Sequence, residues 1–381
     1  MATRPGLKIG RVLGIPIYLH PSWSIIFVLI TLSLATQFKQ QHPHWSEVQH
    51  WTAGILTSVL FFGSVVFHEL AHSVVARKYK IPVISITLFV FGGLARIGRE
   101  PESAKQEFNI AVAGPLASFF LAGSFWSLTK LFPFHEMLGA LSAWLSVTNF
   151  YLASFNLIPG FPLDGGRIFR AVVWNSTKDY SRATRLAGAS GKLFAYGLIL
   201  FGAWYAAVRG QWINGVWTAF IGWFLLTAAQ ESVTQMAVRE ALLGLRAADV
   251  MNQEVPAIAR NESLEEYGAE VLRTGRRCHL VILDGRLLGM MNVHALNSVP
   301  RDEWANTSVQ AVMIPRDLIK WAVPEEPLLG LLERLLTEDV NQMPVIANDA
   351  ADEAHVVGMI SRDSILRVIQ ARTELGQPVG S

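Results

Sequence analysis

The sequence predicts a polytopic α-helical membrane protein with about six transmembrane helices, a small membrane-associated β hairpin, and a cytosolic α/β module at its C-terminal end. Two observations predict this fold class. Of the 381 residues, 51% are hydrophobic and only 16% are charged, whereas an ordinary soluble protein has about 25% charged residues. Apolar runs near the ~20 residues that a helix needs to cross a bilayer fill the first part of the chain, and residues 245–372 return to a soluble composition.

The predicted membrane helices lie within residues 1–235. The first apolar run is too long for a cleaved signal and further runs follow it, so we interpret it as the first membrane helix. Between the second and third runs, residues 83–98 alternate in polarity and are rich in β-branched and aromatic side chains. With a Gly-Gly turn, this pattern predicts a short β hairpin at the membrane boundary. The six apolar runs are 21–38, 52–75, 107–131, 137–158, 186–207 and 212–230.

Lysine and arginine are distributed unequally between the two sides of the predicted membrane domain. The segments that would share one side hold fourteen basic residues, and the other three connections hold three. Because cytoplasmic loops are enriched in basic residues, this asymmetry predicts a cytoplasmic N-terminus and a cytoplasmic C-terminal third. The basic inner loops and the economy of length favour a prokaryotic cell membrane.

The overall charge and the cysteine content are both low. The formal net charge is +2 and the basic residues form no single patch, so we expect no nucleic-acid partner. The single cysteine, Cys278, cannot form an intrachain disulfide. We interpret it as a small buried hydrophobic residue.

The stretch "VVFHELAHSVVA", residues 65–76, carries three ionisable groups inside an apolar run. An ionised side chain at mid-bilayer costs ~2.5 kcal/mol or more, so such groups indicate function rather than packing. On a helix His68 and His72 lie on one face and can bind one metal ion, while Glu69 lies beside that ion. This is the H-E-x-x-H pattern of zinc hydrolases, with two ligands and a general base. In a soluble helix the pattern could arise by chance, but in a membrane span the cost of burial favours a metal.

A third ligand is predicted in "NLIPGFPLDGG", residues 156–166, at the end of the fourth apolar run. Two prolines break the helix there, and glycines free the backbone next to Asp164. Irregular backbone at membrane depth is tolerated where it lines a cavity or is packed in protein. Alternatively, Asp164 caps the helix that follows. The depth of the two residues in the membrane favours the ligand interpretation. His68 lies 16 residues into the second run, which is roughly 24 Å along the helix at ~1.5 Å per residue. This is near the level where the fourth run ends and Asp164 follows.

The pairing of "HELAH" with "NLIPGFPLDGG" in separate spans resembles the site-2 protease family of intramembrane zinc metalloproteases. The segments "FGGLARI" (91–97) and "AGPLAS" (113–118) also resemble segments that flank the catalytic core of that family. The resemblance covers roughly residues 10–230, with four matching motifs in the expected order.

The resemblance implies a set of site residues and a substrate class. It implies His68, His72 and Asp164 as ligands of one Zn²⁺ ion per chain. Glu69 is implied as the catalytic base. The substrate would be a transmembrane segment of another membrane-anchored protein, cleaved within the lipid bilayer as in regulated intramembrane proteolysis.

Three further features have more than one interpretation. Asn156, eight residues before Asp164, has an amide that could serve as an oxyanion donor or as a helix cap. The predicted hairpin could pair with an unwound substrate by strand addition, or it could simply close the protein's own fold. His20 could be a fourth ligand, a substrate contact, or an interfacial anchor. The remaining histidines of the membrane domain, His42, His44, His50 and His135, fall in connections on the far side and are poorly placed for the site.

The C-terminal third contains an internal repeat with a period near 60 residues. "AADVM" recurs as "VQAVM", each followed by strand, helix, two strands and a final helix. This order resembles a tandem pair of CBS domains, over residues 245–305 and 306–372, which also follows the membrane domain in one subgroup of site-2 proteases. Such pairs often sense adenine nucleotides. They can also form homodimers or dock other domains.

The nucleotide-binding pattern of CBS domains is incomplete in both repeats. It requires Thr or Ser before a ribose-binding aspartate three residues further on. The first repeat has Asn292 and Ala295 at those positions, and the second has Ser361 and Ser364, with Asp363 one place early. An adenine nucleotide at the CBS pair is therefore doubtful, and a dimerisation or docking role is an equal alternative.

The competing class of function is a CBS-linked ion or metal transporter, in which intramembrane His, Glu and Asp form a permeation site. A transporter has no special need for a glutamate directly after the first of two histidines spaced four apart, and the two halves of the membrane domain show no inverted repeat. A membrane scaffold with a structural zinc would need a fourth protein ligand, and apart from the His20 alternative none is evident. The sequence therefore favours a zinc metalloprotease, regulated by its CBS pair.

Overall fold

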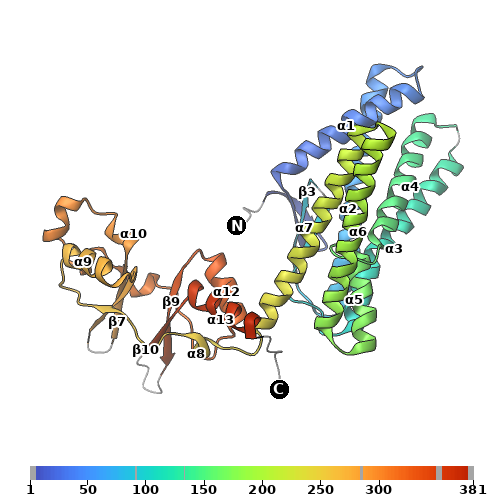
Figure 1. Cartoon of the computed structure of the whole chain (residues 1–381). Coiled ribbons are helices and arrows are strands. Elements are labelled where there is room, and N and C mark those ends of the chain that lie inside the picture. The colour runs from blue at the N-terminus through green and yellow to red at the C-terminus, as the bar shows by residue number, and fades with distance from the viewer. Residues whose placement is uncertain (1–5, 91, 133, 284–285, 349–353, 376–381) are drawn as a thin grey trace. The chain divides into compact units, whose positions relative to one another are not determined.

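The computed structural model describes residues 6–90, 92–132, 134–283, 286–348 and 354–375. The chain divides into two compact units, with the boundary after Met236. We call the first the membrane unit and the second the C-terminal unit, and describe each by itself (Figure 1).

The membrane unit is mostly helical. Within the described residues, five helices are long and apolar enough to span a membrane: α1, α2, α3, α6 and α7. Helix α4, which matches the predicted run 137–158, has 21 residues but falls outside this set, so the number of six spans stays a prediction. The helices are α1 (Pro21–Gln41), α2 (Glu47–Lys78), α3 (Ala104–Leu131), α4 (Glu136–Asn156), α5 (Asp164–Thr177), α6 (Tyr180–Arg209) and α7 (Trp212–Leu242).

Helix α2 lies at the centre of this unit, where it contacts α1, α3 and α4. It begins with a capping box, in which Ser46 and Gln49 satisfy each other's backbone N–H groups. Small residues then let α1 approach closely: a Cβ on Gly54 would lie 3.1 Å from the carbonyl oxygen of Thr31. The hydroxyl of Thr31 donates to Ser58 Oγ at 2.9 Å. Small and hydroxylated residues of this kind are typical of helix contacts in membranes.

A four-stranded sheet lies against α2. Its order is β1 (Leu7–Val12), β2 (Ile15–Leu19), β3 (Val83–Phe89) and β4 (Gly92–Ile97). The predicted hairpin is present as the antiparallel pair β3 and β4. Strands β1 and β2 were not predicted from the sequence. They extend the hairpin through a parallel contact between β2 and β3.

The predicted Gly-Gly turn is wrong. Gly92 pairs with Phe89 and Gly93 pairs with Leu88, so both glycines belong to β4. Val90, which precedes them, lies in a turn, and residue 91 is outside the described residues. Strand β4 is the last in the order and forms one edge of the sheet.

The C-terminal unit shows the predicted repeat. Each half runs through a short helix, a strand, a helix, two strands and a final helix. The strands form one sheet in the order β5-β6-β7-β10-β9, with β8 on β7. The elements of the first half are α8 (Ala247–Val250), β5 (Ala257–Ile258), α9 (Leu264–Thr274), β6 (Cys278–Leu283), β7 (Arg286–Asn292) and α10 (Val293–Leu296). Those of the second are α11 (Val309–Val312), β8 (Ile314–Pro315), α12 (Leu328–Thr337), β9 (Gln342–Asn348), β10 (Ala354–Ser361) and α13 (Arg362–Leu375).

Cys278 lies at the start of β6 and is buried, as the sequence predicts. Burial disfavours the charged thiolate and raises the pKa of this thiol to about 12. The side chain therefore behaves as a small hydrophobic residue in the core of the C-terminal unit.

Candidate metal centre

The structure brings His68, His72 and Asp164 together. Both histidines lie on one face of α2 and are 4% exposed. Asp164, the first residue of α5, directs one carboxylate oxygen at them: Oδ2 is 3.0 Å from His68 Nε2 and 3.1 Å from His72 Nε2. The two Nε2 atoms are 3.2 Å apart. Three donor atoms from two helices that are distant in the sequence thus meet at one point.

This donor set fits zinc. Atoms bound to one tetrahedral zinc ion at about 2.0–2.1 Å lie roughly 3.3 Å apart, and the observed separations are 3.0 to 3.2 Å. Two imidazoles and one carboxylate leave a fourth position open, as in catalytic rather than structural zinc sites. Buried charged groups are generally either paired or coordinate metals, and three donors that converge on one point suit coordination.

The other ring nitrogens are held by α3. His72 Nδ1 donates to the carbonyl oxygen of Ile110 at 2.6 Å, which leaves the lone pair of Nε2 free to face the cluster. His68 Nδ1 is 2.9 Å from the hydroxyl of Ser118. Such outer partners set the tautomer and ring orientation of metal-binding histidines.

Gly114 lets α3 approach the two imidazoles. A Cβ at this position would lie 2.2 Å from His72 Nε2 and 2.5 Å from His68 Nε2, which no side chain could satisfy without displacing a ring. Gly114 and Ser118 both belong to the segment "AGPLAS". The segment thus has a physical role that its spacing alone did not reveal: Gly114 leaves room for both rings, and Ser118 orients that of His68.

The segment between α4 and α5 positions Asp164 through close backbone packing. A Cβ on Gly165 would lie 2.3 Å from the carbonyl oxygen of Ile158, and a Cβ on Gly166 would lie 2.4 Å from the carbonyl carbon of Gly160. From the sequence, the role expected of these glycines is backbone freedom. Both are helical in the structure, so their function is instead to admit neighbouring backbone.

The alternative interpretation of Asp164 as a helix cap does not match the local geometry. The N-cap of α5 is Leu163, which makes no side-chain capping bond, and Asp164 is the first helical residue. A carboxylate in the first turn is nevertheless stabilised by the helix dipole. Its side chain points at the histidines, with Oδ2 bonded to both.

Glu69 lies outside the group of three donors and faces the edge strand β4. A Cβ on Gly93 would be 2.6 Å from Glu69 Cγ and 3.2 Å from Oε1. The glutamate is therefore held between α2 and β4, on the helix that carries both histidines. The absence of a side chain at Gly93, in the segment "FGGLARI", makes room for it.

Asn156 and His20 lie elsewhere. The Asn156 amide donates to the carbonyl oxygen of Leu152 in its own helix at 3.0 Å. His20 is the N-cap of α1, where Nδ1 accepts from the backbone N–H of Ser22 at 3.2 Å. Neither belongs to the group of donors formed by the described residues around His68.

A buried ion pair between α3 and α5 was missed by the sequence analysis. Arg170 Nε donates to Glu107 Oε1 at 2.7 Å, and a second guanidinium nitrogen donates to the same oxygen. The guanidinium also lies over the rings of Phe161 and Tyr180, at 5.0 and 4.8 Å from their centroids. Since removing one partner of a buried pair typically costs ~3–5 kcal/mol, this contact anchors the helix that begins with Asp164. In the sequence, the available signal was Glu107, a carboxylate within the apolar run 107–131.

In the C-terminal unit, the residues at the positions of the nucleotide pattern cap helices. Asn292 Oδ1 accepts from the backbone N–H of Ala295 at 2.8 Å. Ser361 and Ser364 exchange hydrogen bonds between hydroxyl and backbone N–H at 3.0 and 3.1 Å. A hollow of about 490 Å³ lies elsewhere in the unit, and its lining residues are Asp317, Ile319, Lys320, Trp321, Val323, Glu326 and Arg334.

Comparison with known families agrees with this architecture. The profile of peptidase family M50 matches residues 56–137 and 133–198, and the profile of the CBS domain matches residues 309–371. The first match contains both histidines and the second contains Asp164. The second half of the C-terminal repeat is the part that matches the CBS profile.

Relatives of similar length are described as zinc metalloproteases. "Putative zinc metalloprotease Rip3" of Mycobacterium tuberculosis is 32% identical over 98% of this chain and 95% of its own length. The protein sll0528 of Synechocystis, with the same description, is 32% identical over 96% of this chain and 95% of its own. Among solved structures, the site-2 protease from Methanocaldococcus jannaschii is 30% identical, with a TM-score of 0.41, and the match covers 59% of this chain and 94% of that one. Identity of this extent, together with the profile matches, shows that the chain belongs to peptidase family M50, the site-2 protease family of membrane metalloproteases, with a C-terminal CBS module.

Proposed function

We propose that this metalloprotease cleaves transmembrane segments of other membrane proteins, using one zinc ion held by His68, His72 and Asp164 and using Glu69 as the catalytic base. The observation that carries the proposal is the convergence of three donor atoms within 3.2 Å of one another from helices α2 and α5. Glu69 lies one residue from the first donor and outside the donor group.

Each residue has a chemical role in the proposed reaction. When bound, zinc supplies a Lewis acid that polarises the scissile carbonyl. Glu69 removes a proton from the attacking water and returns it to the leaving amine. Ser118 and the carbonyl of Ile110 keep the two imidazoles oriented. Asn156 remains a candidate oxyanion donor, although its amide bonds to Leu152 here.

A helical substrate must unwind before its peptide bonds can be attacked. We assign the edge of β4 to this step, because an unpaired strand edge can bind an extended segment through main-chain hydrogen bonds. Gly93 of β4 lies against Glu69, so a segment added to this edge would run beside the proposed base. Single proline substitutions along β4 test the assignment, and cleavage that survives all of them contradicts it.

The proposed arrangement in the cell follows from charge. Residues 1–235 form the protease domain, and residues 245–305 and 306–372 form the two CBS repeats. The bias of basic residues toward one side assigns the N-terminus and the CBS pair to the cytoplasm of a prokaryotic cell.

The CBS pair regulates cleavage by docking or by homodimerisation. The engagement of Asn292 and Ser361 in helix capping argues against the usual nucleotide contacts.

The experiment that tests the catalytic assignment uses Glu69→Gln. Wild type and variant are purified in detergent for zinc content, and each is coexpressed with a panel of tagged single-span proteins. Zinc retained and cleavage lost is the expected result, because the amide keeps the size of the side chain but cannot accept the proton. Unchanged cleavage would remove Glu69 from the mechanism and bring the transporter alternative forward.

A further inference from the structure

A second group of two histidines and one carboxylate lies at the other end of the membrane unit. His42 and His44 are in the connection between α1 and α2, and Glu136 is the first residue of α4. His68 is 21 residues along α2 from its first residue, Glu47, which corresponds to roughly 30 Å at ~1.5 Å per residue. The two groups are therefore separate sites.

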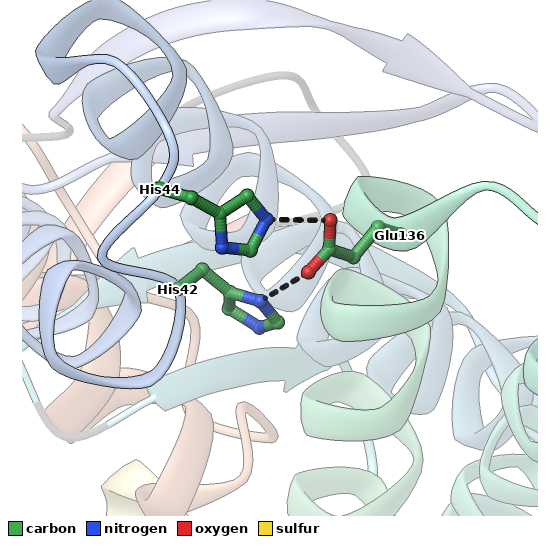
Figure 2. A group of neighbouring side chains, drawn as sticks. All are labelled: His42, His44 and Glu136. Carbon is green, nitrogen blue, oxygen red and sulfur yellow. Dashed lines mark hydrogen bonds and ion pairs between the residues drawn. The ribbon is translucent and has the colours of Figure 1, made fainter.

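The two imidazoles converge on one carboxylate. His42 Nδ1 is 2.9 Å from Glu136 Oε1, and His44 Nε2 is 2.8 Å from Oε2. Figure 2 shows both rings directed at the carboxylate from the same connection. The three donor atoms all lie within 4.8 Å of one another.

The ring of His42 is held in place before any ligand binds. It stacks on Trp45 with ring centroids 4.2 Å apart and an interplanar angle of 11°. Trp45 is 7% exposed and packs in a cluster with Leu34 and Phe38. His50 Nε2 donates to the carbonyl oxygen of His42 at 3.0 Å, which fixes the backbone as well. A donor that is already ordered loses less conformational entropy on binding.

The chemistry of the donors favours a borderline divalent metal. Two imidazole nitrogens and one carboxylate oxygen form the His₂Glu set that binds zinc in hydrolases, and imidazole suits zinc, copper and nickel rather than calcium or magnesium. The side chains of His44 and Glu136 are 61% and 51% exposed, so an ion from solution can reach them. Nitrogen and oxygen bound to one ion at about 2.0–2.1 Å lie roughly 3.3 Å apart. The two bonded pairs, at 2.9 and 2.8 Å, would separate slightly on binding, and the wider separations among the three donors, all within 4.8 Å, would close toward the same value.

We propose that His42, His44 and Glu136 bind a second divalent transition-metal ion of the zinc class. The bound ion joins the connection between α1 and α2 to the start of α4. It is independent of the catalytic assignment, since it shares no residue with the site at His68.

The test compares the zinc content and affinity of three full-length proteins purified in detergent and titrated with zinc chloride. These are wild type, His44→Gln and the matched control His135→Gln, whose exposed side chain makes no capping bond at the start of the same helix. We expect two zinc ions in wild type and in the control, and one in His44→Gln. Loss of a residue that hydrogen-bonds to a metal ligand typically lowers metal affinity by about 10–100-fold. Loss of the ligand His44 itself should lower the zinc affinity of the second site by at least as much.

The difference between variants separates this proposal from the catalytic one. If the site at His68 held no zinc, every count would fall by one while the gap between His44→Gln and the control remained. Equal zinc content and affinity in His44→Gln and His135→Gln would overturn the proposal. The contact of the two histidines with Glu136 would then be an ion pair without a metal. Glu136→Gln provides a second variant of unchanged size, for which the same loss of one zinc is expected.

Discussion

The two histidine–carboxylate groups use the same donors in opposite surroundings. His68 and His72 are buried on α2, the side chain of Asp164 on α5 is 12% exposed, and α3 contacts both rings. His42, His44 and Glu136 lie at a surface, where one stacked tryptophan orders one ring. Donor identity therefore does not distinguish the sites. What distinguishes them is the enclosure, which excludes water and fixes geometry, and a nearby carboxylate that is available as a base.

The carboxylate closest in sequence to the surface group illustrates this difference. Glu47 pairs with Lys39, whereas Glu69 lies between α2 and the glycine-rich start of β4. A paired carboxylate is poorly suited to accept a proton from water. We therefore expect the surface group to bind metal without catalysing hydrolysis.

The largest effect should come from removing metal. Dialysis of the purified protein against a chelator should empty the exposed site first, with no loss of cleavage, and the buried site later, with complete loss. Added zinc should restore cleavage. Zinc content and cleavage of a single-span substrate are followed together over time, and a loss of cleavage in step with the first zinc ion would contradict the assignment of catalysis to the buried group.

The second effect comes from closing the space beside the buried rings. Gly114→Ala should reduce cleavage by about 100-fold, because a new Cβ 2.2 Å from His72 Nε2 must displace that ring and misplacement by about 1 Å can cost this much. Gly123→Ala on the same helix is the control, since a Cβ there has no neighbour within 4 Å. Zinc content, cleavage and thermal midpoint are measured for both, and equal behaviour of the two variants would show that close packing at Gly114 is unimportant.

A smaller effect is expected from the outer partner of His68. Ser118→Ala removes the hydroxyl 2.9 Å from Nδ1 and should lower zinc affinity or cleavage by about 10–100-fold. Ser124→Ala is the control on the same helix, because its hydroxyl bonds to the carbonyl of Phe120 within α3 and not to a site residue. Zinc competition with a chromophoric chelator measures the change, and identical affinities in the two variants would argue against orientation by Ser118.

The smallest effect should occur at the surface group. Trp45→Phe retains an apolar ring but reduces the stacking area on His42, so zinc affinity of the second site should fall by less than about tenfold. Cleavage should not change. Trp51→Phe, a partly exposed position on α2, serves as the control. A loss of cleavage in Trp45→Phe would mean that the two sites are coupled.

Local patterns in the sequence were sufficient for much of the fold and of the candidate site. The spacing of His68 and His72 places both on one helical face whatever the rest of the chain does. Proline and glycine around Asp164 end one helix and begin another, and the repeat in the C-terminal third follows from self-similarity alone. The first two features depend on residues within a few helical turns of one another. The repeat depends on a period that is visible in a single sequence.

Contacts between distant segments were decided only by the tertiary structure. Strand β2 pairs with β3, and Ile17 faces Ile86, which no local pattern encodes. The register that places Gly92 in β4, the space that Gly114 leaves for two imidazoles, and the pair of Glu107 with Arg170 have the same origin. The sequence by itself determined which residues could act and on which helical face they lie, because backbone geometry is local. Which of them meet was determined by packing, because close approach depends on the shapes of surfaces that are far apart along the chain.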